Sequence, residues 1–141
     1  MSPRRLAAVV PTLLLLGLAS GCTYYPSVEH MGGVRLQPER ARAVRLATEA
    51  VVYFRLRSTG KYGDVLTGAE TPAARRAELR DASGKTVTQI EVPGETSVSF
   101  DEKGPRVVLS DLTQELKPGD VIIVTLRFQK SGNLGLVTAV E

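Results

Sequence analysis

The chain has 141 residues, of which 43% are hydrophobic, 23% are charged and 5% are aromatic, with no Trp. This length fits one globular domain with an aliphatic core. One His and one Cys exclude zinc fingers, disulfide scaffolds and other sites built from several imidazoles or thiolates. The formal charge is +3, and loss of Arg4 and Arg5 with a leader would leave 16 basic and 15 acidic residues. This near-neutral balance gives no sign of nucleic-acid binding.

The first 21 residues have the layout of a bacterial secretory signal. After a basic start, the apolar stretch Leu6–Leu16 is shorter than the roughly 20 residues that span a bilayer. Leu18–Cys22 resembles a bacterial lipobox, in which the Cys is lipidated and becomes the new N-terminus, although Ala19 stands where Leu is usual. We expect residues 1–21 to be a lipoprotein signal peptide. Acyl chains on Cys22, palmitate among them, would anchor the protein on the extracytoplasmic face of the cell membrane or outer membrane.

The rest of the chain divides into a linker and a β domain. Residues 22–49 are predicted to be a tether, because Thr23–Gly33 contains Pro26 and a Gly pair. Within the tether, the Ala, Arg, Glu and Leu of Gln37–Glu49 favour a helix. Residues 50–141 are predicted to be the folded domain.

From Ala50 onward the apolar residues recur with a period of two, which is typical of half-buried strands. Turn sequences such as Lys117–Asp120, with Pro and Gly in its middle, separate the alternating segments. Seven or eight short strands at this spacing predict an all-β, antiparallel β-sandwich of immunoglobulin-like type. The expected strands are Ala50–Arg57, Asp64–Glu70, Arg75–Asp81, Thr86–Val92, a segment around Val98, Arg106–Ser110, Val121–Gln129 and Leu134–Val140.

Five segments of the domain, taken in chain order, resemble a known family. They are AVVYFRLRSTG (Ala50–Gly60), DVLTGAETPAARRAEL (Asp64–Leu79), IEVPG (Ile90–Gly94), VVLSDL (Val107–Leu112) and LKPGDVIIVTLRFQKSG (Leu116–Gly132). The ordered series resembles the PCu(A)C family of extracytoplasmic copper chaperones. That resemblance implies a cupredoxin-like sandwich and copper-chaperone ancestry.

The same resemblance places this chain's residues at the family's copper-ligand positions. The first ligand, a His directly after Glu-Leu, falls on Arg80, and the His-x-Met pair falls on Arg106 and Val108. The next outward position, often Met in the family, is Ser110. Cu(I) takes thioether, thiolate or imidazole donors, and a guanidinium group has no lone pair to offer a cation. The resemblance therefore implies a family member that has lost its copper site and has no cofactor.

Three interpretations of function remain open at this point. The first is a non-enzymatic binding or interaction module with an envelope protein partner. The second is a genuine copper chaperone that uses non-standard ligands, for which His30 and Met31 are the remaining soft donors together with Cys22. The third is an envelope enzyme, although a Ser-His-Asp arrangement would have to use His30 on the expected tether.

Arg80, Arg106 and Ser110 form a candidate site for an anion or a partner protein. If Arg80 and Arg106 converge where the family binds copper, they repel each other unless an acid or a bound anion lies between them. The alternative is ordinary surface ion pairing, with Asp81, Asp111 and Glu102 as the local acids. The strand period predicts two faces: Arg106, Val108 and Ser110 exposed, and Val107 and Leu109 buried.

Overall fold

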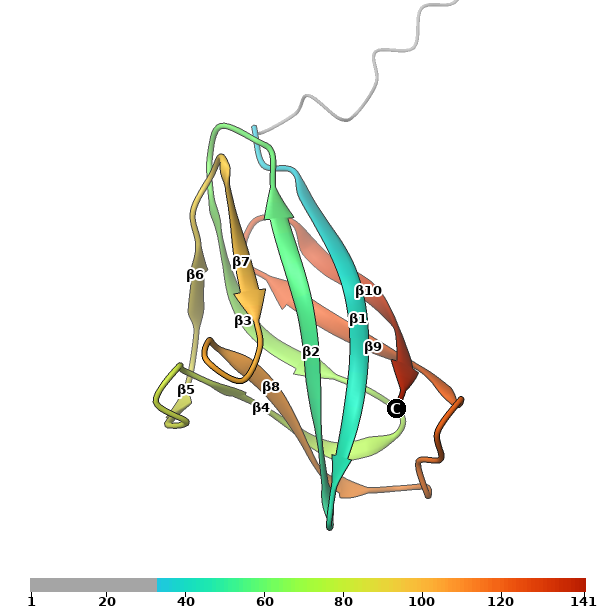
Figure 1. Ribbon diagram of the computed structural model, residues 1–141. Coiled ribbons are helices and arrows are strands. Elements are labelled where there is room, and N and C mark those ends of the chain that lie inside the picture. The colour runs from blue at the N-terminus through green and yellow to red at the C-terminus, as the bar shows by residue number, and fades with distance from the viewer. Residues whose placement is uncertain (1–32) are drawn as a thin grey trace, which may run out of the picture.

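The computed structural model describes residues 33–141, and every regular element in that range is a β-strand (Figure 1). None of the elements in this range is therefore a helix long and apolar enough to cross a membrane. The strands are β1 (Leu36–Leu46), β2 (Glu49–Ser58), β3 (Asp64–Glu70), β4 (Ala74–Arg80), β5 (Thr86–Val87), β6 (Ile90–Val92), β7 (Thr96–Phe100), β8 (Arg106–Leu112), β9 (Val121–Phe128) and β10 (Gly132–Val140).

The strands form one continuous sheet that folds over on itself. Its order is β5-β4-β8-β2-β1-β10-β9-β3-β6, and β7 pairs with β2 beside this path. The fold-over lies between β1 and β10, so β4, β8, β2 and β1 form one layer and β10, β9 and β3 the other (Figure 1). The β1–β10 pair is parallel, and the other strand pairs are antiparallel. The predicted all-β sandwich is confirmed.

The helix expected over Gln37–Glu49 is wrong, because these residues form β1 and the start of β2. β1 pairs with β2 from Leu36 opposite Ser58 to Leu46 opposite Glu49, with a bulge between Glu39 and Arg42. Helix propensity is a weak preference that tertiary pairing overrides, and a short helix without a packed face is marginal in water. The folded domain consequently begins before Ala50, inside the stretch expected to be a tether.

The main core lies between the two layers, as the alternation in sequence predicts. Phe54 of β2 stacks on Phe100 of β7 with ring centroids 4.2 Å apart. Neighbouring outward residues on β9 stay exposed, with Val121 at 63% and Ile123 at 56%. The inward residues are Ala50, Val52, Phe54 and Leu56 on β2 and Ile122, Val124, Leu126 and Phe128 on β9, each 5% exposed or less.

The single strand expected over Thr86–Val92 is also wrong. Thr86–Val87 is β5 and pairs with β4, whereas Ile90–Val92 is β6 and pairs with β3. The chain therefore passes from one layer to the other between these strands, and one alternating segment supplies an edge strand to each layer. This division and the added β1 explain why the structure of residues 33–141 has more strands than the seven or eight expected.

Asp64 fastens the turn between β9 and β10 to the start of β3. Its side chain is buried, and its two carboxylate oxygens accept four hydrogen bonds. The donors are the N–H groups of Val65, Lys130 and Ser131 at 2.8–2.9 Å and the Ser131 hydroxyl at 2.6 Å. Burial by itself raises the pKa of Asp64, but these hydrogen bonds outweigh it, and the pKa lies below its usual value.

Candidate functional site

The structure brings Arg80 and Arg106 together. They end β4 and begin β8, and they face each other directly in the antiparallel register of these strands. Directly opposed residues have Cβ atoms about 4.5–5.5 Å apart, so the two guanidinium groups start from neighbouring points on one face of the sheet. Both side chains are half-buried, and in the described residues neither Nε atom has a hydrogen-bond partner although both atoms are buried.

The acid nearest to Arg80 is Glu78, which the sequence reasoning missed. Glu78 Oε2 lies 3.5 Å from Arg80 Nη2, because residues two apart on a strand share a face. The Glu78 carboxylate also accepts a 3.5 Å hydrogen bond from the Thr86 hydroxyl of β5. The i, i+2 spacing of Glu78 and Arg80 was the available signal. The local acids expected from the sequence are Asp81, Asp111 and Glu102.

The three expected acids lie elsewhere. Asp81 Oδ1 accepts hydrogen bonds from the Ser83 hydroxyl at 2.6 Å and from the Ser83 and Lys85 N–H groups at 3.0 Å. The pKa of Asp81 lies below its usual value. The hydrogen bond from the Ser83 hydroxyl contributes most to this lowering, and the one from the Lys85 N–H contributes next. Asp111 pairs with Arg76, with Oδ2 3.1 Å from Nε, and Glu102 lies in the exposed loop between β7 and β8.

The predicted exposure of Val108 and Ser110 is wrong. Val108 is 1% exposed and packs with Val51 and Tyr53 in a small apolar cluster outside the main core. This cluster forms because neighbouring strands carry apolar residues on their outer faces at the same level, with Val51 directly opposite Val108. One strand's own sequence does not show this. The predicted burial of Val107 and Leu109 is confirmed, at 0% exposure each.

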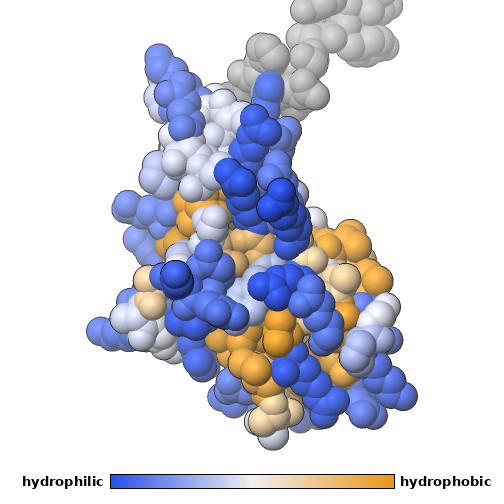
Figure 2. All heavy atoms as spheres, in the orientation of Figure 1, coloured by the Kyte–Doolittle hydropathy of each residue, from blue (hydrophilic) through white to orange (hydrophobic). Residues whose placement is uncertain are grey.

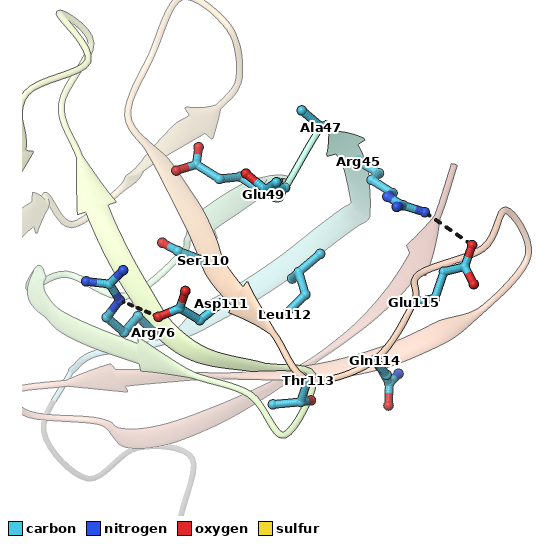
Figure 3. Close-up of a pocket in the computed structure, with 11 residues that line it drawn as sticks. Arg45, Ala47, Glu49, Arg76, Ser110, Asp111, Leu112, Thr113, Gln114 and Glu115 are labelled. Atoms are coloured by element: carbon cyan, nitrogen blue, oxygen red, sulfur yellow. Dashed lines mark ion pairs between the residues drawn. The ribbon is translucent and has the colours of Figure 1, made fainter.

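Ser110 does not join the Arg80–Arg106 pair. It is 9% exposed and faces Arg76 across the β4–β8 register, four residues along β8 from Arg106. Ser110 lies instead at an open cleft of about 660 Å³ near the β1–β2 turn, drawn in Figure 3. The structure therefore separates the candidate residues into a pair of arginines and a distant serine.

The cleft beside Ser110 is a polar surface on which two ion pairs lie (Figure 3). Arg45 Nη1 lies 3.7 Å from Glu115 Oε1, and the Arg76–Asp111 pair lies at the other side. All four side chains are largely exposed, so each pair contributes at most about 1 kcal/mol. The cleft arises from the β1–β2 turn and from the segment after β8, whose proximity the sequence pattern could not indicate.

Two observations concern metal binding by the described part of the chain. No group of three or more His, Cys, Asp or Glu side chains in residues 33–141 is arranged to hold a metal ion. The same range contains no His, Cys or Met in its sequence. Cys22, His30 and Met31 lie outside the described residues, so their predicted roles remain predictions.

Solved structures with the same fold include two PCuAC domains and one protein in its Cu(I) form. The copper-bound PCuAC domain from PmoF2 has a TM-score of 0.68 at 23% identity, over 75% of this chain and 92% of that chain. The apo PCuAC domain from PmoF1 has a TM-score of 0.66 at 22% identity, over 78% and 94%. The Cu(I) form of DR1885 from Deinococcus radiodurans has a TM-score of 0.64 at 22% identity, over 79% of each chain. At these identities the likeness establishes the fold.

One protein family matches most of the domain. The family described as "Putative lipoprotein LpqE-like" matches residues 34–140, and the chain therefore belongs to it. The match begins just before β1, in agreement with the structural start of the domain. A search of curated proteins finds no match.

Proposed function

We propose that this member of the LpqE-like family is a lipid-anchored, extracytoplasmic interaction module that has the PCuAC-type sandwich without its copper site. The observation that carries the proposal is the complete absence of His, Cys and Met from residues 33–141, which include all ten strands. Cu(I) sites need these soft donors. The resemblance to the PCu(A)C family assigns its copper-ligand positions to Arg80, Arg106 and Val108. These residues supply two guanidinium groups and a buried apolar side chain.

The anchoring part of the proposal rests on Cys22 and on the point where the chain enters the sandwich. The Gly33 carbonyl accepts a 2.9 Å hydrogen bond from the Tyr62 N–H, and the Arg35 carbonyl accepts a 3.0 Å bond from the Thr59 N–H. These bonds fix the start of the domain at one end of the sandwich, near the β2–β3 loop (Figure 1). A lipid on Cys22 would draw this end toward the membrane. The β1–β2 turn, at the opposite end of both strands, would then face away from it.

Labelling and fractionation test the anchor. Expressed in a bacterium, the full chain should incorporate labelled palmitate and enter the detergent phase on partitioning. Cys22→Ser should abolish the label, because the acylated sulfur is gone, while Ser20→Ala at a neighbouring small position should retain it. A wild-type protein that is secreted in soluble form, with an N-terminus other than residue 22, contradicts the proposed anchor.

We infer a non-enzymatic role from the neighbours and the cleft. The solved neighbours named above are copper-related domains, two of them in copper-bound form. The open cleft of the described domain is lined by exposed ion pairs and by hydroxyl and amide side chains, without an imidazole or a thiol. Such a surface suits the binding of another polar surface better than nucleophilic catalysis by a hydroxyl group, for which His is the usual activating base, and residues 33–141 contain no His.

A second candidate function is copper delivery through donors that precede the domain. The copper-bound neighbours favour it, and His30 and Met31 are the residues that could supply imidazole and thioether ligands. Competition of the full chain with a Cu(I) chelator distinguishes the two. Our proposal expects the full chain to bind Cu(I) no more tightly than about micromolar. Two soft donors without a built site hold the ion weakly and compete poorly with the chelator. Stoichiometric tight binding that His30→Ala with Met31→Ala removes would establish the alternative.

A further inference from the structure

Arg80 and Arg106 are an unbalanced pair of cations. Like charges that face each other directly across two strands destabilise the pairing. Within residues 33–141, the one carboxylate that forms an ion pair with either arginine is that of Glu78, whose Oε2 lies 3.5 Å from Arg80 Nη2. The two arginines and Glu78 together carry a net charge of +1. One further monoanion would neutralise the group.

The two arginines also hold unused hydrogen-bond donors. The Nε atoms of Arg80 and Arg106 are both buried and have no partner among the described residues. An unpaired buried donor is unfavourable, and a guanidinium group binds a carboxylate most strongly through two parallel N–H donors. Two directly opposed arginines therefore lack acceptor oxygens for their buried Nε–H groups.

Arg76, on the same strand as Arg80, has a carboxylate partner for its Nε–H group. It lies four residues before Arg80 on the same face of β4, and its Nε is 3.1 Å from Asp111 Oδ2. Asp111 reaches this place from β8. β8 has no acid at the corresponding place beside Arg80, because Arg106 stands directly opposite Arg80 and Val107 follows it.

The loop beside the pair is a glycine turn. A Cβ placed on Gly84 would meet only Arg106 Nη2 within 4 Å, at 3.8 Å. Gly84 has a φ of 85°, which other residues rarely adopt, so the turn keeps this position free of a side chain. The guanidinium group of Arg106 is thus left uncrowded on the side of the turn.

We propose that Arg80 and Arg106 form a binding site for a single carboxylate group, which would bridge the two guanidinium forks. The inference rests on the proposed function, in which these positions no longer hold copper, and it gives the chemistry of what replaces the metal. A carboxylate suits the site better than a phosphate dianion, because Glu78 leaves one positive charge to neutralise and repels a second negative one. The carboxylate can come from a small free acid or from an acidic side chain of an envelope partner.

The side-chain Nε–H signals of the arginines report this site directly. The full chain in non-ionic detergent, labelled with nitrogen-15, is titrated with sodium acetate at constant ionic strength kept with sodium chloride. The Arg80 and Arg106 signals should shift and saturate, while the Arg76 signal should stay in place. Arg80→Ala or Arg106→Ala should weaken acetate binding by about tenfold or more, since each removes charged hydrogen bonds. Arg76→Ala, the matched control, should leave it unchanged.

Two further titrations define the ligand. Inorganic phosphate at neutral pH should bind more weakly than acetate. An acetylated and amidated glutamate tripeptide should bind at least as well as acetate if the natural source is a partner side chain, whereas exclusion of the tripeptide indicates a free acid; both results support the carboxylate site. No saturating shift with acetate, an equal shift at Arg76, or tighter binding of phosphate overturns it. These failures leave the proposed function standing, because that proposal fails on tight Cu(I) binding instead.

Discussion

Replacing Asp64 with Ala should be among the most destabilising changes to a polar residue of the domain. The substitution removes the acceptor of three backbone N–H groups and one hydroxyl and frees the β9–β10 turn from β3. A hydrogen bond contributes about 1 kcal/mol net, and one to a charged group about 1.5–3 kcal/mol. Because this turn lies near the surface, water replaces part of the loss. We expect the free energy of unfolding to fall by about 3 kcal/mol.

The pH dependence gives the same residue a second signature. The pKa of Asp64 is lower in the folded chain than its ordinary value of 3.8, so the folded state favours the ionised form. The stability that this provides is complete above about pH 4 and is lost as the pH falls through the folded-state pKa. Wild type should therefore lose more stability between pH 5 and pH 2 than Asp64→Ala does. The lowered pKa of Asp81 leaves the variant a residual decline of the same sign.

Urea denaturation followed by circular dichroism at several pH values measures both effects. Asp101→Ala is the matched control, since this exposed carboxylate accepts one hydrogen bond from the described part of the chain, that of the Lys103 N–H. It should cost less than about 1 kcal/mol. If Asp64→Ala costs no more than the control, or if its stability declines as steeply in acid as that of wild type, the account of this carboxylate is refuted.

Six further substitutions test the packing by the same denaturation assay. Val108→Ala should lower the free energy of unfolding by about 1–2 kcal/mol and Leu109→Ala by about 2–4 kcal/mol, because both side chains are buried. Arg106→Ala should lower it by less than about 0.5 kcal/mol, because it relieves a like-charge pair. Equal losses at Val108 and Arg106 would contradict the burial of Val108 in the outer apolar cluster. Gly60→Ala should destabilise strongly, since its Cβ would clash with the Gly33 carbonyl oxygen, while Gly135→Ala, with open space around it, should be near neutral. Arg76→Ala should cost less than about 1 kcal/mol, as expected for an exposed ion pair, and a larger loss would show that this pair fastens β4 to β8.

The inward faces of the strands were predictable from sequence because their signal is local. The alternation in β2 and β9 has one explanation, a face buried between two layers, and the structure has those residues inside. β1 was missed for the opposite reason. Its composition favours a helix, and its strand conformation depends on pairing with β2 and β10, which local sequence does not encode.

In the candidate site, too, some features could be predicted from local sequence and others depend on neighbouring strands. That Arg80 and Arg106 face each other could be anticipated, because the resemblance assigned both positions to one cluster of ligands. The burial of Val108 could not, because it depends on Val51 and Tyr53 lying at the same level on the neighbouring strand. The acid beside Arg80 could have been found from the i, i+2 spacing of Glu78.

The central claim is that the sandwich keeps the place of the PCuAC copper site but has replaced its donors. Restoring the donors tests it most directly: Cu(I) competition is measured for wild type and for the Arg80→His, Arg106→His, Val108→Met triple variant of the full chain. The account predicts no tight binding by wild type and one Cu(I) per chain in the triple variant, because two opposed imidazoles and a nearby thioether meet the needs of Cu(I). A variant with Ala at the three positions should not bind. Tight binding by wild type, or none by a folded triple variant, would contradict the claim.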